Sequence, residues 1–252
     1  MPIRCCIHQP EHLSYPGFWV KLLLSDVWVA FDTAQYQKSH YHNRNKIAGP
    51  SGWQWLTVPV IVPNHKSPIS SVVIADEFNP SRHIATVTHT YRSAPSFHRI
   101  HAILNYAFQR ASKHRSLEML NLELTESIAT YLGIHLTIIR ASTLIRAQAL
   151  EIVEPTKDKN QRLINICHAV SADTYVCGSG SEKYMDNEKF IQSGIAVEQV
   201  GYIPNPYPRP EPFQPNLSII DLLMCSPDNK TVVNYLKSSF TTRTIPDPCL
   251  TK

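Results

Sequence analysis

The chain has 252 residues, of which 43% are hydrophobic and 17% are charged, so it is long enough to bury a sizeable core as one large globular domain. Its 24 basic and 20 acidic residues are scattered, which argues against nucleic acid as a partner and leaves an anionic small molecule. The six cysteines form no CxxC pair, and no apolar run has the length of a signal peptide or a membrane span. We therefore expect a cytoplasmic protein without a membrane span.

The first elements predict a parallel βαβ unit. Residues 3–8 are an apolar run that stops before Pro10, residues 17–24 form a short helical pattern, and residues 27–31 are a second apolar run closed by Asp32. A strand, a helix and a strand in so few residues make a right-handed crossover with both strands parallel. The loop after the first strand should then lie at the carboxyl edge of the sheet, where open α/β sheets bind ligands.

The middle of the chain predicts further strands and a helical part. We expect strands at residues 54–62, 70–74 and 135–139, because these runs are apolar and bounded by turn residues. Between residues 95 and 131 there are few breakers and the apolar residues recur at helical spacing, which predicts a helical pair. A further amphipathic helix is expected over residues 163–170.

Glycine and proline mark the last third of the chain. A strand at residues 175–177 is expected to enter a glycine loop, and the six prolines between residues 204 and 215 favour an extended crossing. A helical pattern resumes at residues 217–223, and the tail from Thr241 is expected to be loose.

These elements predict an α/β fold, with a Rossmann-like parallel sheet and an added helical portion, in a single domain over residues 1–252. We expect a strand-rich part over residues 1–95 and a mostly helical part over residues 96–170. The remaining part, residues 171–252, should hold the glycine loop, the proline-rich crossing and the C-terminal helix. None of these patterns predicts the oligomeric state.

The loop after the first strand is the strongest candidate for a binding site. It carries His8, Gln9 and His12, and Gly17 opens the helix that follows. Backbone N–H groups at a helix N-terminus, assisted by imidazole donors, form a seat for a phosphate or a carboxylate. The alternative is a loop whose polar side chains satisfy its own backbone. No third ligand stands at a zinc-site spacing from the two histidines, so no metal is expected.

A donor-rich segment follows the second strand, where Lys38 precedes the triplet Asn43, Arg44 and Asn45. An arginine can bind a carboxylate or a phosphate through two parallel hydrogen bonds, and the asparagines add neutral donors and acceptors. We therefore interpret the triplet as a contact for an anionic group of the substrate. The alternative is a solvated polar loop.

Two later segments hold further candidates. Histidine is the usual general acid or base near neutral pH, and His83, close in sequence to Tyr91, is our candidate; the alternative is a hydrogen-bonded core histidine. Gly178 and Gly180 could let backbone amides approach an anion, although a short GxG is a weak motif. The chain has no GxxxxGK[ST] motif, and Cys177 is expected to be a buried thiol rather than a nucleophile.

Several blocks of the chain, in order, resemble the WbqC-like family. The first matching residues are Gln9-Pro10, Gly17-Phe18, Lys21, Ser25-Asp26, Asp32, Gln35-Tyr36, Lys38, Asn43 to Ile47 and Trp55 to Val60. The later matches are His83, Thr86, Tyr91 to Phe97, Gly178 to Asp186 and Phe213 to Asp221. His12, Ser14 and Pro16 depart from the pattern, so we expect the specificity of this protein to depend on them.

The resemblance implies a function in surface-polysaccharide biosynthesis, such as that of O-antigen, because the family is associated with such gene clusters in bacteria. Its members have been suggested to transfer aminoacyl groups, glycine among them, to amino sugars. The order of the first elements also resembles pantothenate synthetase and its nucleotidyltransferase relatives. That likeness implies ATP as a cofactor, with His8, His12 and Lys38 on its phosphates and Gln35 beside the acyl substrate.

Our hypothesis is therefore a transferase that joins an acyl or aminoacyl group to an amine on a nucleotide-linked amino sugar, forming an amide. The candidate catalytic residues are His8, His12 and His83. The candidate substrate-binding residues are Gln9, Lys21, Asp32, Gln35, Lys38, Asn43, Arg44, Asn45, Tyr91, Gly178, Gly180, Tyr184 and Asp221. Two alternatives stay open: an ATP-dependent amide ligase, and a non-catalytic module that binds a sugar nucleotide or a carrier protein.

Overall fold

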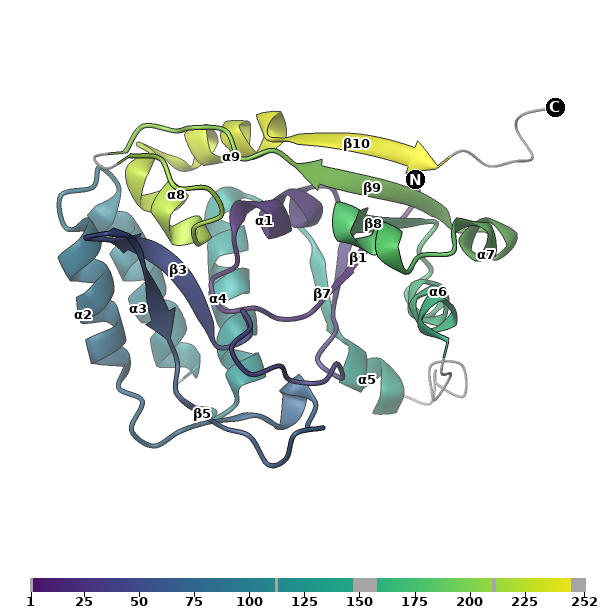
Figure 1. Cartoon of the computed structure of the whole chain (residues 1–252), viewed down its shortest axis with the longest axis horizontal. Coiled ribbons are helices and arrows are strands. Elements are labelled where there is room, and N and C mark those ends of the chain that lie inside the picture. The colour runs from purple at the N-terminus through teal and green to yellow at the C-terminus, as the bar shows by residue number, and fades with distance from the viewer. Residues whose placement is uncertain (1, 112, 147–157, 210–211, 246–252) are drawn as a thin grey trace.

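The computed structural model describes residues 2–111, 113–146, 158–209 and 212–245, and a six-stranded sheet with the order β10-β9-β8-β1-β2-β7 lies at its centre (Figure 1). The strands are β1 (Arg4–His8), β2 (Val27–Ala30), β7 (Thr137–Arg140), β8 (Thr174–Gly178), β9 (Ala196–Tyr202) and β10 (Phe240–Ile245). Neighbours pair in parallel, except that β10 runs antiparallel to β9. The chain builds one half of the sheet outward from β1 and then returns to build the other half, as in Rossmann folds. The predicted α/β class is confirmed.

The N-terminal βαβ unit forms as its sequence predicts. The helix α1 (Pro16–Leu23) begins with a proline at its first position, where the missing N–H breaks no helical hydrogen bond. It connects β1 to β2, which pair in parallel with Cys6 opposite Trp28. All four residues of β2 are buried, as expected for a strand covered on both faces.

Helices cover both faces of the sheet and divide the core in two. On one face, Cys6, Trp28 and Val176 pack in the larger apolar cluster, which includes residues of α1 and α4 (Leu117–Leu132). On the other face, Cys5 and Tyr175 pack in a smaller cluster with α6 (Lys159–Ala169) and α7 (Asn187–Gln192). The short helix α5 (Ala141–Arg146) continues directly from β7.

The added helical portion consists of α2 (Pro80–Tyr91), α3 (Phe97–Ala111) and α4. The last two confirm the helical pair expected between residues 95 and 131. Ser116 caps α4 by accepting a hydrogen bond from the Met119 N–H at 3.3 Å, and Gly133 ends it at a φ of 67°, which glycine adopts without steric cost. In the described part of the chain, no helix has the length and apolar composition needed to cross a membrane.

Two of the expected strands in the first third of the chain differ from the prediction. The apolar run 54–62 is broken at Pro59 into β4 (Gly52–Thr57) and β5 (Val60–Ile61). β4 pairs with β3 (Arg44–Gly49) in a hairpin separate from the central sheet, and β5 pairs with β6 (Val73–Ile74). The remainder of the expected strand 70–74 lies mainly in a 3₁₀ turn, Ile69–Ser71. The pattern of apolar residues therefore identified these segments, but it did not identify the strands with which they pair.

The C-terminal part is more ordered than its sequence suggested. Described residues of the proline-rich crossing form no helix or strand, while Pro210 and Glu211 lie outside the described residues. The helices α8 (Ile219–Cys225) and α9 (Asn229–Ser238) follow. The expectation of a loose tail is wrong for residues 241–245, because β10 pairs with β9 along its whole length. The rest of that tail lies outside the described residues.

Candidate functional site

A cavity of about 530 Å³ opens at the carboxyl ends of β1 and β2, and Tyr175 of the neighbouring strand β8 also lines it. The strand order reverses at β1. On one side of β1 the sheet is extended by β2 and β7, and on the other side it is extended by β8 and β9. Open α/β sheets bind their ligands at such a point, and the volume suits a small molecule. The lining residues are Ile7, His8, Gln9, Phe31, Ala34, Gln35, Lys159, Arg162, Leu163, Tyr175 and Tyr184. We call it the switch-point cavity.

His8 supplies a neutral base to this cavity. Its Nδ1 lies 2.9 Å from the backbone carbonyl oxygen of Gln9, which can only accept, so Nδ1 carries the proton and Nε2 carries a lone pair. Burial, together with the nearby ammonium of Lys21, holds the pKa of His8 well below its ordinary value. The imidazole is therefore uncharged at neutral pH and can accept a hydrogen bond through Nε2.

Two glutamines at the cavity are each held by one end of their amide. The Gln9 Oε1 atom accepts a hydrogen bond from His42 Nε2 at 2.8 Å, and Gln35 Nε2 donates to the His65 carbonyl at 2.6 Å. These bonds orient the side chains and use one atom of each amide. The Gln9 amino group and the Gln35 carbonyl oxygen have no hydrogen-bond partner among the described residues, so they can contact a ligand.

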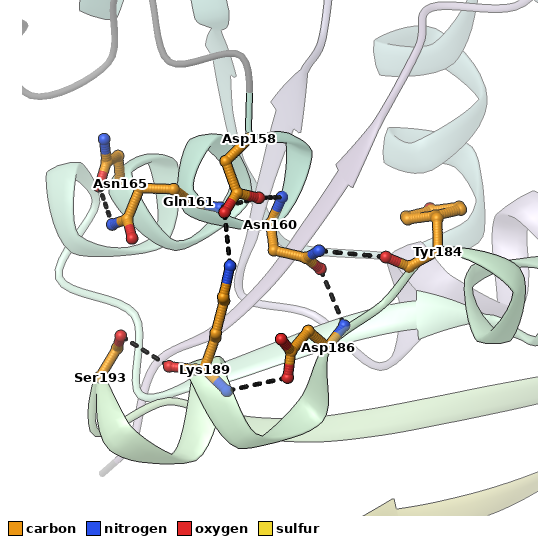
Figure 2. Close-up of polar contacts among 8 residues, drawn as sticks. All are labelled: Asp158, Asn160, Gln161, Asn165, Tyr184, Asp186, Lys189 and Ser193. Carbon is orange, nitrogen blue, oxygen red and sulfur yellow. Dashed lines mark hydrogen bonds and ion pairs between the residues drawn. The ribbon is translucent and has the colours of Figure 1, made fainter.

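The opposite wall is assembled by a polar network around α6, shown in Figure 2. Asn160 donates from Nδ2 to the Tyr184 carbonyl at 3.1 Å and accepts at Oδ1 from the Asp186 N–H at 3.0 Å. The N-cap residue Asp158 also accepts a 2.6 Å hydrogen bond from the ammonium of Lys189 on α7. These contacts hold the segment after β8 against α6, so that Tyr184 lines the same cavity as the cationic residues of that helix.

Lys21 brings a positive charge to the same edge of the sheet from α1. Its side chain is buried, and a Cβ added at Gly178 would lie 4.0 Å from its Cδ atom, which places the lysine stem beside the end of β8. Burial raises the pKa of Glu11 to about 7, although the attraction of Lys21 opposes that shift. Burial likewise raises the pKa of Cys177 to about 11, so this thiol is a poor nucleophile at neutral pH.

Asp32 and Gly180 lie close in sequence to lining residues but are not among them. Asp32 is fully buried, and its Oδ1 atom accepts a 2.8 Å hydrogen bond from the Ser142 N–H at the start of α5. Its Oδ2 atom is buried without a hydrogen-bond partner in the described part of the chain. Gly180 lies in the 3₁₀ turn Ser179–Lys183 after β8, with open space where a side chain would stand.

The structure places the other two candidate catalytic histidines elsewhere. His12 and His83 are buried, and their Nε2 atoms lie 3.1 Å apart. Neither residue lines the switch-point cavity. Ser14 and Pro16, the other departures from the family pattern, are buried as well.

The asparagines of the Asn-Arg-Asn triplet bind the protein's own backbone. Asn43 donates to the Val58 carbonyl at 2.8 Å, and Asn45 donates to the carbonyls of His12 and Leu13 at 3.1 and 3.0 Å. These two residues therefore hold the hairpin and the opening loop together. Their predicted donors are already used within the protein.

The two cationic candidates of the same segment lie outside the switch-point cavity. Arg44 stacks on Trp55, with its guanidinium carbon 4.0 Å from the ring centre, and donates to the Ser39 carbonyl. Lys38 is exposed. Neither residue is among those that line the cavity.

Tyr91 and Asp221 meet in the core, far apart in sequence. The Tyr91 hydroxyl donates to Asp221 Oδ1 at 2.9 Å and accepts from the Ala48 N–H at 3.0 Å. Asp221 is fully buried, and it also accepts from the Tyr207 hydroxyl at 2.6 Å and lies 3.5 Å from the Arg209 guanidinium. This carboxylate is compensated by the protein itself, which indicates a structural role.

Sequence reasoning missed Lys159, Arg162 and Tyr175, which line the cavity. No local motif distinguishes them, because they reach the site only through the pairing of β1 with β8. The sequence has a second feature that bears on charge, because no aspartate or glutamate occurs from Thr33 to Ala75. The cations of this acid-free segment are Lys38, Arg44, Lys46 and Lys66.

The comparisons with known proteins agree with the resemblance. An uncharacterized protein of Mycobacterium tuberculosis (strain ATCC 25618 / H37Rv), Rv1507c, is 28% identical over 225 residues, which cover 87% of this chain and 92% of that protein. No solved structure matches the chain significantly. A model of the WbqC-like protein family matches residues 9–233, a range that begins just after β1 and includes both glutamines of the cavity and α6. The chain belongs to the WbqC-like protein family.

Proposed function

We propose that this chain binds a nucleotide-linked substrate in the switch-point cavity and there transfers an acyl or aminoacyl group, such as glycyl, to an amine. The observation that carries the proposal is the cavity itself, at the carboxyl end of β1, the strand at which the strand order reverses. The proposal extends the sequence-based hypothesis but moves its reacting base from His83 or His12 to His8.

The lining of the cavity supports a ligand that joins an anion to a ring. Lys159 and Arg162 are cationic, and a phosphate or a carboxylate is the complementary group. Phe31 and Tyr184 offer aromatic surface for a base or a sugar ring. Gln9 and Gln35 then provide one neutral donor and one neutral acceptor, which can fix the orientation of that ring.

His8 supports the chemical step, because its Nε2 lone pair can accept the proton of an attacking amine. In the proposed step the amine nitrogen forms a bond to the acyl carbon while the bond from that carbon to its leaving group breaks. The amine proton is relayed through His8 Nε2 to the departing group, so that the buried imidazole is not left charged. Holding the two reactants together in one cavity supplies rate enhancement through proximity.

The test combines binding with turnover. Purified protein is titrated calorimetrically with ATP and with a UDP-linked amino sugar. It is then incubated with that sugar and either a thioester-linked glycine or glycine plus ATP, while the products are followed by mass spectrometry. We expect binding of the sugar nucleotide and, from the thioester-linked glycine, a new amide on its amine with release of the thiol. Lys159→Gln should weaken binding about tenfold through loss of one charge-assisted contact, on the order of 1.4 kcal/mol. His8→Phe should abolish turnover while leaving binding within a few-fold.

The matched control is Lys230→Gln, which removes an exposed lysine of α9 that does not line the cavity. Equal loss of binding in both lysine variants would contradict the assigned site. Release of AMP and pyrophosphate would instead identify the ATP-dependent ligase, and binding without product from ATP, glycine or a thioester-linked glycine would identify a binding module. A cytoplasmic location and a function in surface-polysaccharide biosynthesis belong to the same proposal, and fractionation of cells and the glycans of a deletion strain test them.

A further inference from the structure

A second cavity, of about 320 Å³, lies between β4 and the start of α2. It shares no lining residue with the switch-point cavity. Among its lining residues are Trp55 of β4, Arg82, His83 and Thr86 of α2, and Glu77 just before that helix. Arg82 and Glu77 are exposed, whereas His83 is only 6% exposed. A buried titratable side chain thus lines a cavity that the proposed function does not use.

His83 is oriented through His12 by Asn121 of α4, whose side chain is fully buried. Its Nδ2 atom donates to the carbonyl of Pro10 at 3.2 Å and to that of His42 at 2.8 Å. Both donors of the amide are then used, so Oδ1 faces His12 Nδ1, 3.1 Å away, as an acceptor. Since a carbonyl oxygen cannot donate, His12 carries its proton on Nδ1.

The chain of hydrogen bonds continues from His12 to His83. With its proton on Nδ1, neutral His12 presents a lone pair at Nε2, and the His83 Nε2 atom 3.1 Å away must donate to it. His83 then keeps a lone pair on Nδ1, for which there is no hydrogen-bond partner among the described residues. The edge-to-face contacts of its ring with Phe78 and Phe108 fix the plane of the imidazole.

Burial keeps both rings uncharged. Loss of solvation on burial lowers the pKa of His12 to about 4. Burial is also the larger cause for His83, whose pKa is lowered to about 2, and electrostatic repulsion from His12 adds to that shift. Near neutral pH the Nδ1 atom of His83 therefore remains an acceptor and does not gain a proton to donate. A neutral, oriented acceptor selects a ligand group with an O–H or N–H to donate.

The charge around the cavity selects an anion as the second group of the ligand. Arg82 lines the cavity, and Arg44 lies over the Trp55 ring. Lys46 lies 5.6 Å from the centre of that ring, whereas Glu77 is the one acidic residue of the lining among the described residues. The balance is positive, which disfavours an ammonium and favours a carboxylate or a phosphate. The donor that meets His83 is then a hydroxyl group.

We propose that this cavity is a second small-molecule site, which binds a hydroxylated anion with its hydroxyl group donating to His83 Nδ1 and its anionic group facing Arg82. The two recognition elements differ in kind, because one selects a neutral donor and the other a negative charge. The site lies on α2 and β4 and does not depend on the proposed chemistry at His8.

The experiment is calorimetric titration of the full chain with glycerol 3-phosphate and with gluconate, which carry the hydroxyl group beside a phosphate or a carboxylate. Propyl phosphate lacks the hydroxyl group and glycerol lacks the anion. We expect at least one hydroxylated anion to bind at least tenfold more tightly than either partial compound. His83→Phe and Arg82→Gln should each weaken that binding about tenfold or more, and Arg92→Gln, an exposed arginine at the end of α2, should leave it unchanged.

A nitrogen-15 NMR spectrum of the histidines keeps the test independent of how well the His83 variant folds. We expect a neutral His83 ring with its proton on Nε2, and a change in the Nδ1 shift when the hydroxylated anion is added. A proton on His83 Nδ1 would overturn the proposal. So would equal binding of propyl phosphate, or full affinity in the Arg82→Gln variant, or no binding of either hydroxylated anion.

Discussion

The two cavities present neutral histidines that are held in opposite ways. His8 lies at the end of a strand, and its Nδ1 proton is used by the carbonyl of the very next residue. His83 lies on a helix, and its state is fixed by Asn121 and His12, two residues from other parts of the chain. The orientation of His8 should persist when residues elsewhere are substituted, because it depends on the next residue in the chain. The orientation of His83 depends on residues of two other segments and should be lost when either is substituted.

The two arrangements are joined by hydrogen bonds. Gln9, which lines the switch-point cavity, accepts from His42 Nε2, and the His42 carbonyl accepts from Asn121. From there the path runs through His12 to His83. Asn121 lies in the middle of this path and bonds to both His42 and His12. A substitution at Asn121 should therefore break the connection between the two sites.

The largest effect is expected from Asn121→Leu. The substitution leaves the carbonyls of Pro10 and His42 and the Nδ1 proton of His12 buried without a partner, which should lower the free energy of unfolding by on the order of 4 kcal/mol. Urea unfolding measures it. The control is Asn105→Leu, which removes a half-buried amide that donates to His101 one turn earlier in the same helix, and which should cost less than about 1 kcal/mol. Similar losses in both variants would mean that Asn121 contributes no more to stability than a half-buried asparagine does.

The next effect concerns pH. The pKa of His12 is about 4 and that of His83 about 2 in the folded protein, below their ordinary value of 6.5. As pH falls below 6.5 the unfolded chain binds protons that the folded chain does not, so stability is full above that value and is lost on acidification. Glu11 acts in the opposite sense, because its pKa is raised to about 7 and its contribution is lost as pH rises from 4.5 towards that value.

His83→Phe removes one of these histidines. Each contributes a slope of about 1.4 kcal/mol per pH unit between pH 6 and 4.5, so the unfolding free energy of the variant should vary less steeply than that of the wild type by that amount. Over this interval the difference amounts to about 2 kcal/mol. Urea unfolding at a series of pH values measures both slopes. Parallel slopes would mean that His83 titrates normally in the folded state.

The smallest effect is expected from Tyr91→Phe. The hydroxyl group bridges the Ala48 N–H and Asp221, and its loss should cost about 1 to 2 kcal/mol of stability. Ligand affinity at the switch-point cavity should stay within twofold of the wild type, because Tyr91 does not line that cavity. Tyr106→Phe, at an exposed position on α3, serves as the control and should change neither quantity. Weaker binding without loss of stability would return Tyr91 to the substrate-binding residues.

The central fold was predictable because its signals are local. The βαβ unit follows from two apolar runs with a short helical pattern from Gly17 between them, and the end of α4 follows from Gly133. The hairpin β3–β4 was missed because β3 begins at Arg44, in a polar triplet that resembles a loop. Its pairing partner, rather than its composition, makes that segment a strand.

The candidate site was predicted only in part, for the same reason. His8, Gln9, Gln35 and Tyr184 were identified from motifs, and the structure gathers them around one cavity. The roles of Asn45 and Asp221 were not predictable, because the hydrogen bonds that use up their polar atoms come from residues distant in sequence. Asn121 carries no motif at all, yet it determines the proton positions of two histidines.

The acid-free segment from Thr33 to Ala75 has a consequence for association rates. It runs from the rim of the switch-point cavity at Ala34 and Gln35 to the hairpin beside the second cavity at Trp55. Two of its cations, Arg44 and Lys46, lie beside Trp55, and the segment itself holds no carboxylate to offset their charge. We therefore expect diffusing anions to be attracted towards the second cavity before any contact forms, with capture that is faster at low ionic strength and slows as salt is added.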